Sequence, residues 1–148
     1  MPRRYGAGEL TGIDVSQVCL NGHCITRTAA TGPEHRKAFC PDCGAATIMA
    51  CPQCDAIIPG LDWDSLGPTP RKPPNYCQAC GSAHPWHQSA IANAIEVLEE
   101  LELGEADLAS AKTALPDLMS DTPKSEGAVL RMRRIYGNEA CKPCMLLP

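Results

Sequence analysis

The sequence is poor in aromatic side chains. Among 148 residues it has one Phe, two Trp and three Tyr. Aromatic residues bury the largest apolar areas in protein cores, so a core of ordinary size would have to be built here almost entirely from aliphatic side chains. The chain therefore needs a second source of stability.

Long apolar segments are also absent from the sequence. No window of about 18 apolar residues occurs, which excludes a membrane-spanning helix. The first residues, MPRRYGAGELTG, lack the apolar run of a signal peptide. We therefore expect a cytoplasmic protein without membrane association. In that compartment cysteine thiols stay reduced.

An excess of positive charge is missing as well. The formal net charge is −4. Residues 1–88 carry seven Lys or Arg against seven Asp or Glu, and residues 89–148 carry six against ten. Nucleic-acid binding depends on cations that neutralise phosphates. A nucleic-acid partner is therefore less expected than another protein. The sequence gives no indication of oligomeric state.

Cysteine, in contrast, is abundant, with ten residues. Eight Cys and His side chains form four closely spaced pairs between residues 19 and 80. The pairs are Cys19/His23 in VCLNGH, Cys40/Cys43 in FCPDCG, Cys51/Cys54 in ACPQCD and Cys77/Cys80 in YCQACG. Two ligands separated by a tight turn can reach one Zn²⁺ ion, with zinc–sulfur distances of about 2.3 Å. Four such pairs predict two structural zinc ions as cofactors.

The residue after each CxxC pair supports this interpretation. A metal-binding turn of this kind often requires a positive φ angle, which Gly adopts freely and Asp or Asn tolerate. Gly44, Asp55 and Gly81 occupy these positions, and Gly22 precedes His23. The pattern predicts tight turns, called knuckles below, at all four pairs.

Sequence leaves the grouping of the knuckles open. We expect sequential grouping, the first with the second and the third with the fourth, because Phe39 and Tyr76 each precede the closing knuckle and could pack over the opening one. An interleaved grouping would give a RING-like cross-brace. A third possibility joins Cys40/Cys43 to Cys51/Cys54 and leaves the outer pairs to meet.

Several further Cys and His residues are possible metal ligands. Cys24 is an alternative to His23, which we prefer because Gly22 sets up its turn. His84 and His87 follow the last knuckle, and we expect them at the surface or beside the ligands rather than on the metal. Cys141 and Cys144 form a fifth CxxC in the tail, where we expect a loose dithiol.

The remainder of the chain has helical periodicity. Apolar residues recur at helical spacing over 89–103 and again over 108–118, where Pro116 is expected to limit the helix. Together these segments predict a helical hairpin. A third helix is expected from Thr122 and Pro123 to about Tyr136. The predicted domains are a double zinc-ribbon module at 15–88, a helical segment at 89–137 and a tail at 138–148.

The motifs VCLNGH, FCPDCGAATI, CPQCDAIIPG, YCQACG followed by PW, and SDTPKS resemble a bacterial family of small zinc-ribbon proteins of uncharacterised function. The resemblance spans residues 15 to about 130. It implies that the eight paired Cys and His residues are the ligands. It implies no activity.

These patterns together predict a small α+β protein, in which tandem zinc ribbons precede a helical hairpin and a third helix. Every knuckle has a partner, so neither site has the open coordination position of a catalytic zinc. We expect a non-enzymatic protein-interaction adaptor or regulatory scaffold. The alternatives are a nucleic-acid-binding ribbon and a RING-like cross-brace module.

Overall fold

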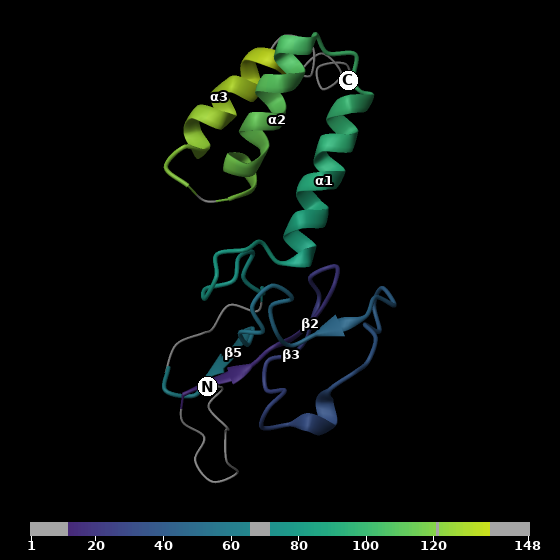
Figure 1. Cartoon of the computed structure of the whole chain (residues 1–148), viewed down its shortest axis with the longest axis vertical. Helices are drawn as coiled ribbons and strands as arrows, with labels where there is room; N and C mark the ends of the chain where they lie inside the picture. The colour runs from purple at the N-terminus through teal and green to yellow at the C-terminus, as the bar shows by residue number, and fades with distance from the viewer. Residues whose placement is uncertain (1–11, 66–71, 121, 137–148) are drawn as a thin grey trace, which may run out of the picture. The chain divides into compact units, whose positions relative to one another are not determined.

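The computed structural model describes residues 12–65, 72–120 and 122–136 (Figure 1). In chain order its elements are β1 (Ile13–Val15), β2 (Gln17–Cys19), β3 (Cys24–Thr26), the 3₁₀ turn η1 (Pro33–His35), β4 (Thr47–Ile48), β5 (Pro59–Asp62), α1 (Pro85–Glu100), α2 (Glu105–Met119) and α3 (Ser125–Tyr136). The expected α+β class is confirmed: short antiparallel strands precede three helices. No helix within the described ranges is long and apolar enough to cross a membrane.

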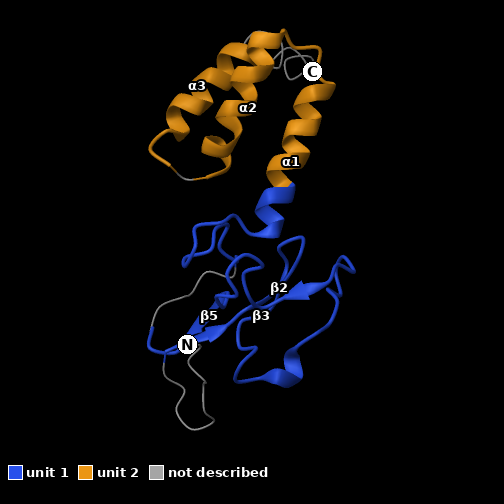
Figure 2. Ribbon diagram, in the orientation of Figure 1, with its two compact units in different colours: residues 1–89 blue, residues 90–148 orange. Residues whose placement is uncertain are grey.

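The chain divides into two compact units, residues 1–89 and 90–148 (Figure 2). The first unit contains all the strands, arranged as a two-stranded sheet, β1-β5, and a three-stranded sheet in the order β3-β2-β4. All these pairings are antiparallel. Strands of two to four residues cannot support a large sheet by themselves, so the stability of this unit must come from elsewhere.

The apolar core of the first unit is small. Val18, Ile58 and Trp86 are its buried members, and Ile48 packs against them. Trp86, from the first turn of α1, lies against Gly22: a methyl group added to Gly22 would stand 3.1 Å from the Trp86 Cβ atom. The Trp86 indole N–H also donates a hydrogen bond to the carbonyl oxygen of Pro74, at 3.1 Å. One indole therefore covers the first knuckle and fixes the chain ahead of the last one.

The prediction that an aromatic residue packs over each opening knuckle is wrong for Phe39, and for Tyr76 it stays a prediction. The Phe39 side chain is 65% exposed, because Trp86 already occupies the space beside the first knuckle. Tyr76 is 41% exposed, and its ring meets the edge of His87 with a hydroxyl-to-Nε2 distance of 3.1 Å. The covering aromatic thus comes from the following helix.

A buried carboxylate, which the sequence analysis did not single out, organises the loops around β1. Asp14 is 1% exposed. It accepts hydrogen bonds from the backbone N–H groups of Val15 (2.6 Å) and Ala30 (3.0 Å), the hydroxyl of Thr31 (2.5 Å) and the indole of Trp63 (3.3 Å). Burial raises the pKa of Asp14, but these donors outweigh burial, so the pKa lies below its usual value of 3.8.

The helices of the second unit form their own core. Leu98 of α1 packs with Ala111 and Leu115 of α2, and partly buried residues such as Met132 and Ile135 of α3 surround this cluster. The apolar stripes predicted for the helices therefore do form a core.

The helix boundaries differ from the prediction in several places. α1 begins at Pro85, four residues early, because the carbonyl of His84 accepts the N–H of Gln88 and proline suits the first helical position. α2 continues through Pro116, since loss of one hydrogen bond in the last turn is tolerated. α3 begins at Ser125, because residues 123 and 124 form a turn after Thr122.

Replacing Asp14 with Asn tests the role of this buried carboxylate as a hydrogen-bond acceptor. The amide would place an NH₂ group among groups that are all donors, and one or more of them would lose its acceptor. We expect a loss of about 1 to 3 kcal/mol in the free energy of unfolding, measured by urea denaturation at neutral pH with zinc held constant. The exposed Asp42→Asn variant is the matched control, and equal losses in both would contradict the role of Asp14.

Candidate metal centres

The three CxxC segments form the same hairpin three times. In each, the residue before the first Cys bridges the residue seven positions later: Phe39 with Ala46, Ala50 with Ile57, and Tyr76 with Ala83. The N–H after the second Cys donates to the carbonyl of the first Cys, at 2.8–2.9 Å in all three. This tight closure turns both sulfurs of a knuckle to the same side.

The predicted left-handed residues adopt positive φ angles. The φ angles are 71° at Gly44, 60° at Asp55 and 74° at Gly81. Asp55 is the one residue other than Gly with a positive φ in the described part of the chain. Gly22, at φ 89°, shapes the fourth turn, where the N–H of Cys19 donates to the carbonyl of His23 at 2.9 Å.

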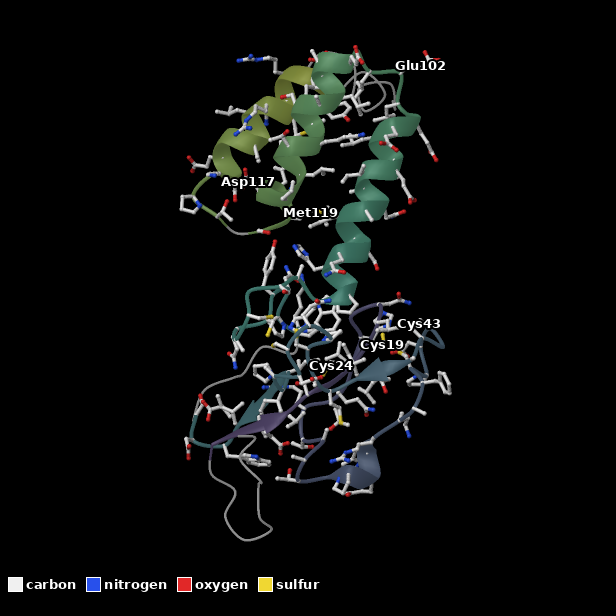
Figure 3. The ribbon with its side chains drawn as sticks, viewed as in Figure 1. Cys19, Cys24, Cys43, Glu102, Asp117 and Met119 are labelled. Carbon is white, nitrogen blue, oxygen red and sulfur yellow. The ribbon has the colours of Figure 1, made fainter. Side chains whose placement is uncertain are left out.

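The first cluster joins the knuckle between β2 and β3 to the one after Phe39. It contains Cys19, His23, Cys40 and Cys43, with their candidate ligand atoms all within 4.8 Å of one another. The Nδ1 atom of His23 lies 3.6 Å from the sulfurs of Cys19 and Cys40 and 3.3 Å from that of Cys43. The Cys19 and Cys43 sulfurs are 3.7 Å apart. Figure 3 labels Cys19 and Cys43 of this cluster and also Cys24, which the cluster does not include.

The second cluster joins the remaining two knuckles and consists of sulfur alone. Its members are Cys51, Cys54, Cys77 and Cys80. The sulfur of Cys51 lies 3.8 Å from that of Cys80, and the sulfur of Cys54 lies 3.6 Å from that of Cys77. In both clusters the first Cys of each knuckle is buried and the second ligand is exposed.

These separations are the edges of a tetrahedron around a metal ion. With zinc–sulfur bonds of about 2.3 Å, tetrahedral geometry places two sulfurs about 3.8 Å apart, and it places a sulfur and an imidazole nitrogen about 3.6 Å apart. The measured distances match both values. A disulfide would require about 2.05 Å, and all eight described cysteines are free. Both clusters are therefore suited to hold a metal ion.

The electrostatics of the clusters also favour a bound cation. The backbone N–H of Ala45 and the amide of Asn21 lower the pKa of the Cys43 thiol to about 6. The hydroxyl and backbone N–H of Ser82 likewise lower the pKa of the Cys80 thiol to about 6. Donors of this kind favour thiolates.

Cys54 has the opposite shift. The backbone N–H of Ala56 lowers its pKa, but the neighbouring sulfurs of Cys80, Cys77 and Cys51, together with burial, raise it to about 12. Four sulfurs at these distances cannot all ionise without a positive charge between them.

The grouping of knuckles in the structure is sequential. The interleaved RING-like cross-brace does not occur, because Cys19 and His23 meet Cys40 and Cys43 rather than Cys51 and Cys54. The grouping of the two central knuckles does not occur either. His23, and not Cys24, points into the first cluster. Cys24 is half-buried on β3, where burial raises the pKa of its thiol.

His84 and His87 lie outside both clusters, as expected, but they are not at the surface. His84 is 1% exposed and stacks on Trp86 with ring centroids 4.6 Å apart. Both of its ring nitrogens are buried without a hydrogen-bond partner. His87 is 4% exposed. Burial lowers the pKa of both imidazoles, which keeps them neutral. Cys141 and Cys144 lie outside the described residues.

Asn21 is the contributor to the site that sequence reasoning missed. Its side-chain amide donates to the Cys43 sulfur at 3.4 Å across the cluster. Its position between Cys19 and His23 is the only sequence signal for this role.

Comparison with known proteins identifies one family. The family model described as an uncharacterized protein conserved in bacteria (DUF2321) matches residues 12–144. No curated protein and no solved structure matches the chain.

Separate substitutions of His23 and Cys24 test which of these two residues is the metal ligand. His23→Ala removes one corner of the first tetrahedron, so we expect the bound metal to fall from two ions to one per chain. Cys24→Ala should leave two. Mass spectrometry under native conditions measures both variants, and loss of an ion from Cys24→Ala alone would show that the neighbouring thiol is the ligand.

Proposed function

The chain belongs to this uncharacterized bacterial family, and we propose that it is a non-enzymatic zinc protein whose two ions are structural and whose ribbon unit serves as a protein-interaction adaptor or regulatory scaffold. The observation that carries the proposal is the tetrahedral spacing of four protein ligands in each cluster.

Zinc is the metal that fits these donors best. Cys₃His and Cys₄ sets arranged as tetrahedra are typical of structural zinc, and they suit soft metals rather than Mg²⁺ or Ca²⁺. A catalytic zinc has three protein ligands and leaves one position for water or substrate. Here each cluster supplies four protein ligands. This closed arrangement supports a structural role and no chemistry at the metal.

The support for an adaptor comes from apolar side chains beside the first cluster. The N–H of Leu20 donates to the carbonyl of Ala46, and Ala46 bridges Phe39, so the three residues form one row across neighbouring strands. Residues opposite one another share a face of a sheet. All three are exposed, Phe39 most of all. An exposed apolar row of this kind is a natural contact for another protein.

Charge weighs against nucleic acid at this unit. Residues 1–88 are neutral overall, and zinc with three thiolates and a histidine adds −1 while zinc with four thiolates adds −2. Phe39 would offer one surface for stacking a base, with Lys37 nearby. Single-strand binding, however, uses several aromatic side chains along a positive groove.

Removal of the metal tests the structural role. Structural zinc contributes on the order of 10 kcal/mol in small sites, more than the small core of the first unit supplies. We expect two zinc ions per chain by elemental analysis and loss of near-ultraviolet circular dichroism when a chelator removes them under reducing conditions. Deletion of residues 139–148 is the matched control, and it should leave the zinc content unchanged. A folded, metal-free chain would contradict the proposal.

Truncation of Phe39 tests the adaptor role. Phe39→Ala should weaken capture of a partner protein in affinity purification by at least about 1 kcal/mol, about fivefold or more for a central apolar contact, without changing zinc content. Ile13→Ala removes another exposed apolar side chain of the same unit and is the control. Micromolar binding to mixed DNA or RNA that collapses with salt and is lost in Phe39→Ala would instead establish the nucleic-acid function.

A further inference from the structure

The outward faces of α1 and α3 carry opposite charges. On α1, Glu96, Val97 and Glu100 lie within one turn of one another on one side, all exposed, with Val97 52% exposed. Buried Leu98 is two residues from Glu100, about 200° round the helix. This side, the α1 acidic face, therefore points away from the core of the second unit.

α3 has the complementary arrangement. Leu130, Arg133 and Arg134 follow the i, i+3, i+4 spacing of one helical side. Leu130 is 64% exposed, and buried Ala128 lies two residues from it on the opposite side. We name this side the α3 basic face. Glu126 stands one turn before Leu130, so the positive charge gathers toward the end of the helix.

Within the described part of the chain, neither face forms an ion pair. The ion pairs among the described residues are His35 with Glu34 and Lys112 with Glu99, and neither involves Glu96, Glu100, Arg133 or Arg134. The last turn of α1 contains no basic residue. Carboxylates at a helix C-terminus oppose the helix dipole. Cations brought against this turn would relieve that repulsion.

We propose that the α1 acidic face binds the α3 basic face of a second copy of this chain. Each face presents an exposed aliphatic residue with two like charges beside it: Val97 with Glu96 and Glu100, and Leu130 with Arg133 and Arg134 toward the end of the helix. The two faces therefore match in apolar content and oppose each other in charge. Because the two faces lie on different helices, the contact joins copies head to tail, and a pair of copies keeps one free basic face on one copy and one free acidic face on the other. This association does not depend on the zinc or adaptor function.

Sedimentation equilibrium of the full zinc-loaded chain, with a reductant that prevents disulfide dimers, tests the association. The weight-average mass should exceed the 15.8 kDa of one chain and rise with protein concentration. Added salt should lower it, because charge attraction across an interface is screened. A mass of one chain from micromolar to millimolar concentration would overturn the proposal.

Charge reversal identifies the faces. Glu96→Lys with Glu100→Lys makes both faces basic, and Arg133→Glu with Arg134→Glu makes both acidic. Each double variant alone should associate on the order of tenfold more weakly or not at all, because like charges then meet. An equimolar mixture of the two should recover the association, since every contact in it joins opposite charges.

The control variant changes the net charge by the same amount as Glu96→Lys with Glu100→Lys, but in the first unit. Glu34→Lys with Asp64→Lys likewise raises the net charge by four, on exposed residues of the first unit that lie outside the knuckles, and should associate like the unmodified chain. Zinc content, measured in every variant, should stay at two ions, which separates this test from the zinc proposal. Association that survives both double variants, or that the mixture fails to restore, would show that the faces do not bind one another.

Discussion

The mutual repulsion of clustered sulfur ligands is the constraint on which the first unit depends. Three or four thiols within hydrogen-bonding distance are held by turns whose N–H groups favour the ionised form, yet the pKa of Cys54 rises to about 12 because its neighbours oppose a further negative charge. Backbone geometry and electrostatics therefore conflict until a cation lies between the sulfurs. Strands of two to four residues and a core of three buried apolar side chains could not cross-link the knuckles as a metal ion in each cluster would.

Trp86 belongs both to the small core of the first unit and to the first turn of α1. It packs against Gly22 at the first cluster, contacts the small core and donates to the carbonyl of Pro74 on the approach to the last knuckle. It belongs to the first turn of α1, so the start of that helix is part of the ribbon unit. His84 is buried as a consequence: it stacks on the indole and leaves its nitrogens without partners. An unpaired buried imidazole costs free energy, which the stacked packing offsets.

Local patterns were readable from the sequence, and long-range packing was not. The positive φ angles follow from residue type at a fixed position after each CxxC pair, so Gly44 and Gly81 could be predicted without knowing the fold. The family resemblance and the α+β class followed from the same motifs. Which aromatic covers the first knuckle depends on where a helix 60 residues later begins, and spacing does not encode that. Asp14 was missed for a similar reason, because its donors come from residues 15, 30, 31 and 63.

The core of the second unit is built differently, from residues of the packed helices. Buried alanines at positions 111, 114 and 128 let the helices approach closely, but each buries little apolar area. With so little area buried inside, larger aliphatic side chains such as Val97 and Leu130 remain outside. In soluble proteins, charged residues beside such exposed apolar side chains reduce non-specific association. When one face has only carboxylates and another mainly guanidinium groups, the same flanking charges select which surfaces can meet, since like faces repel and unlike faces attract.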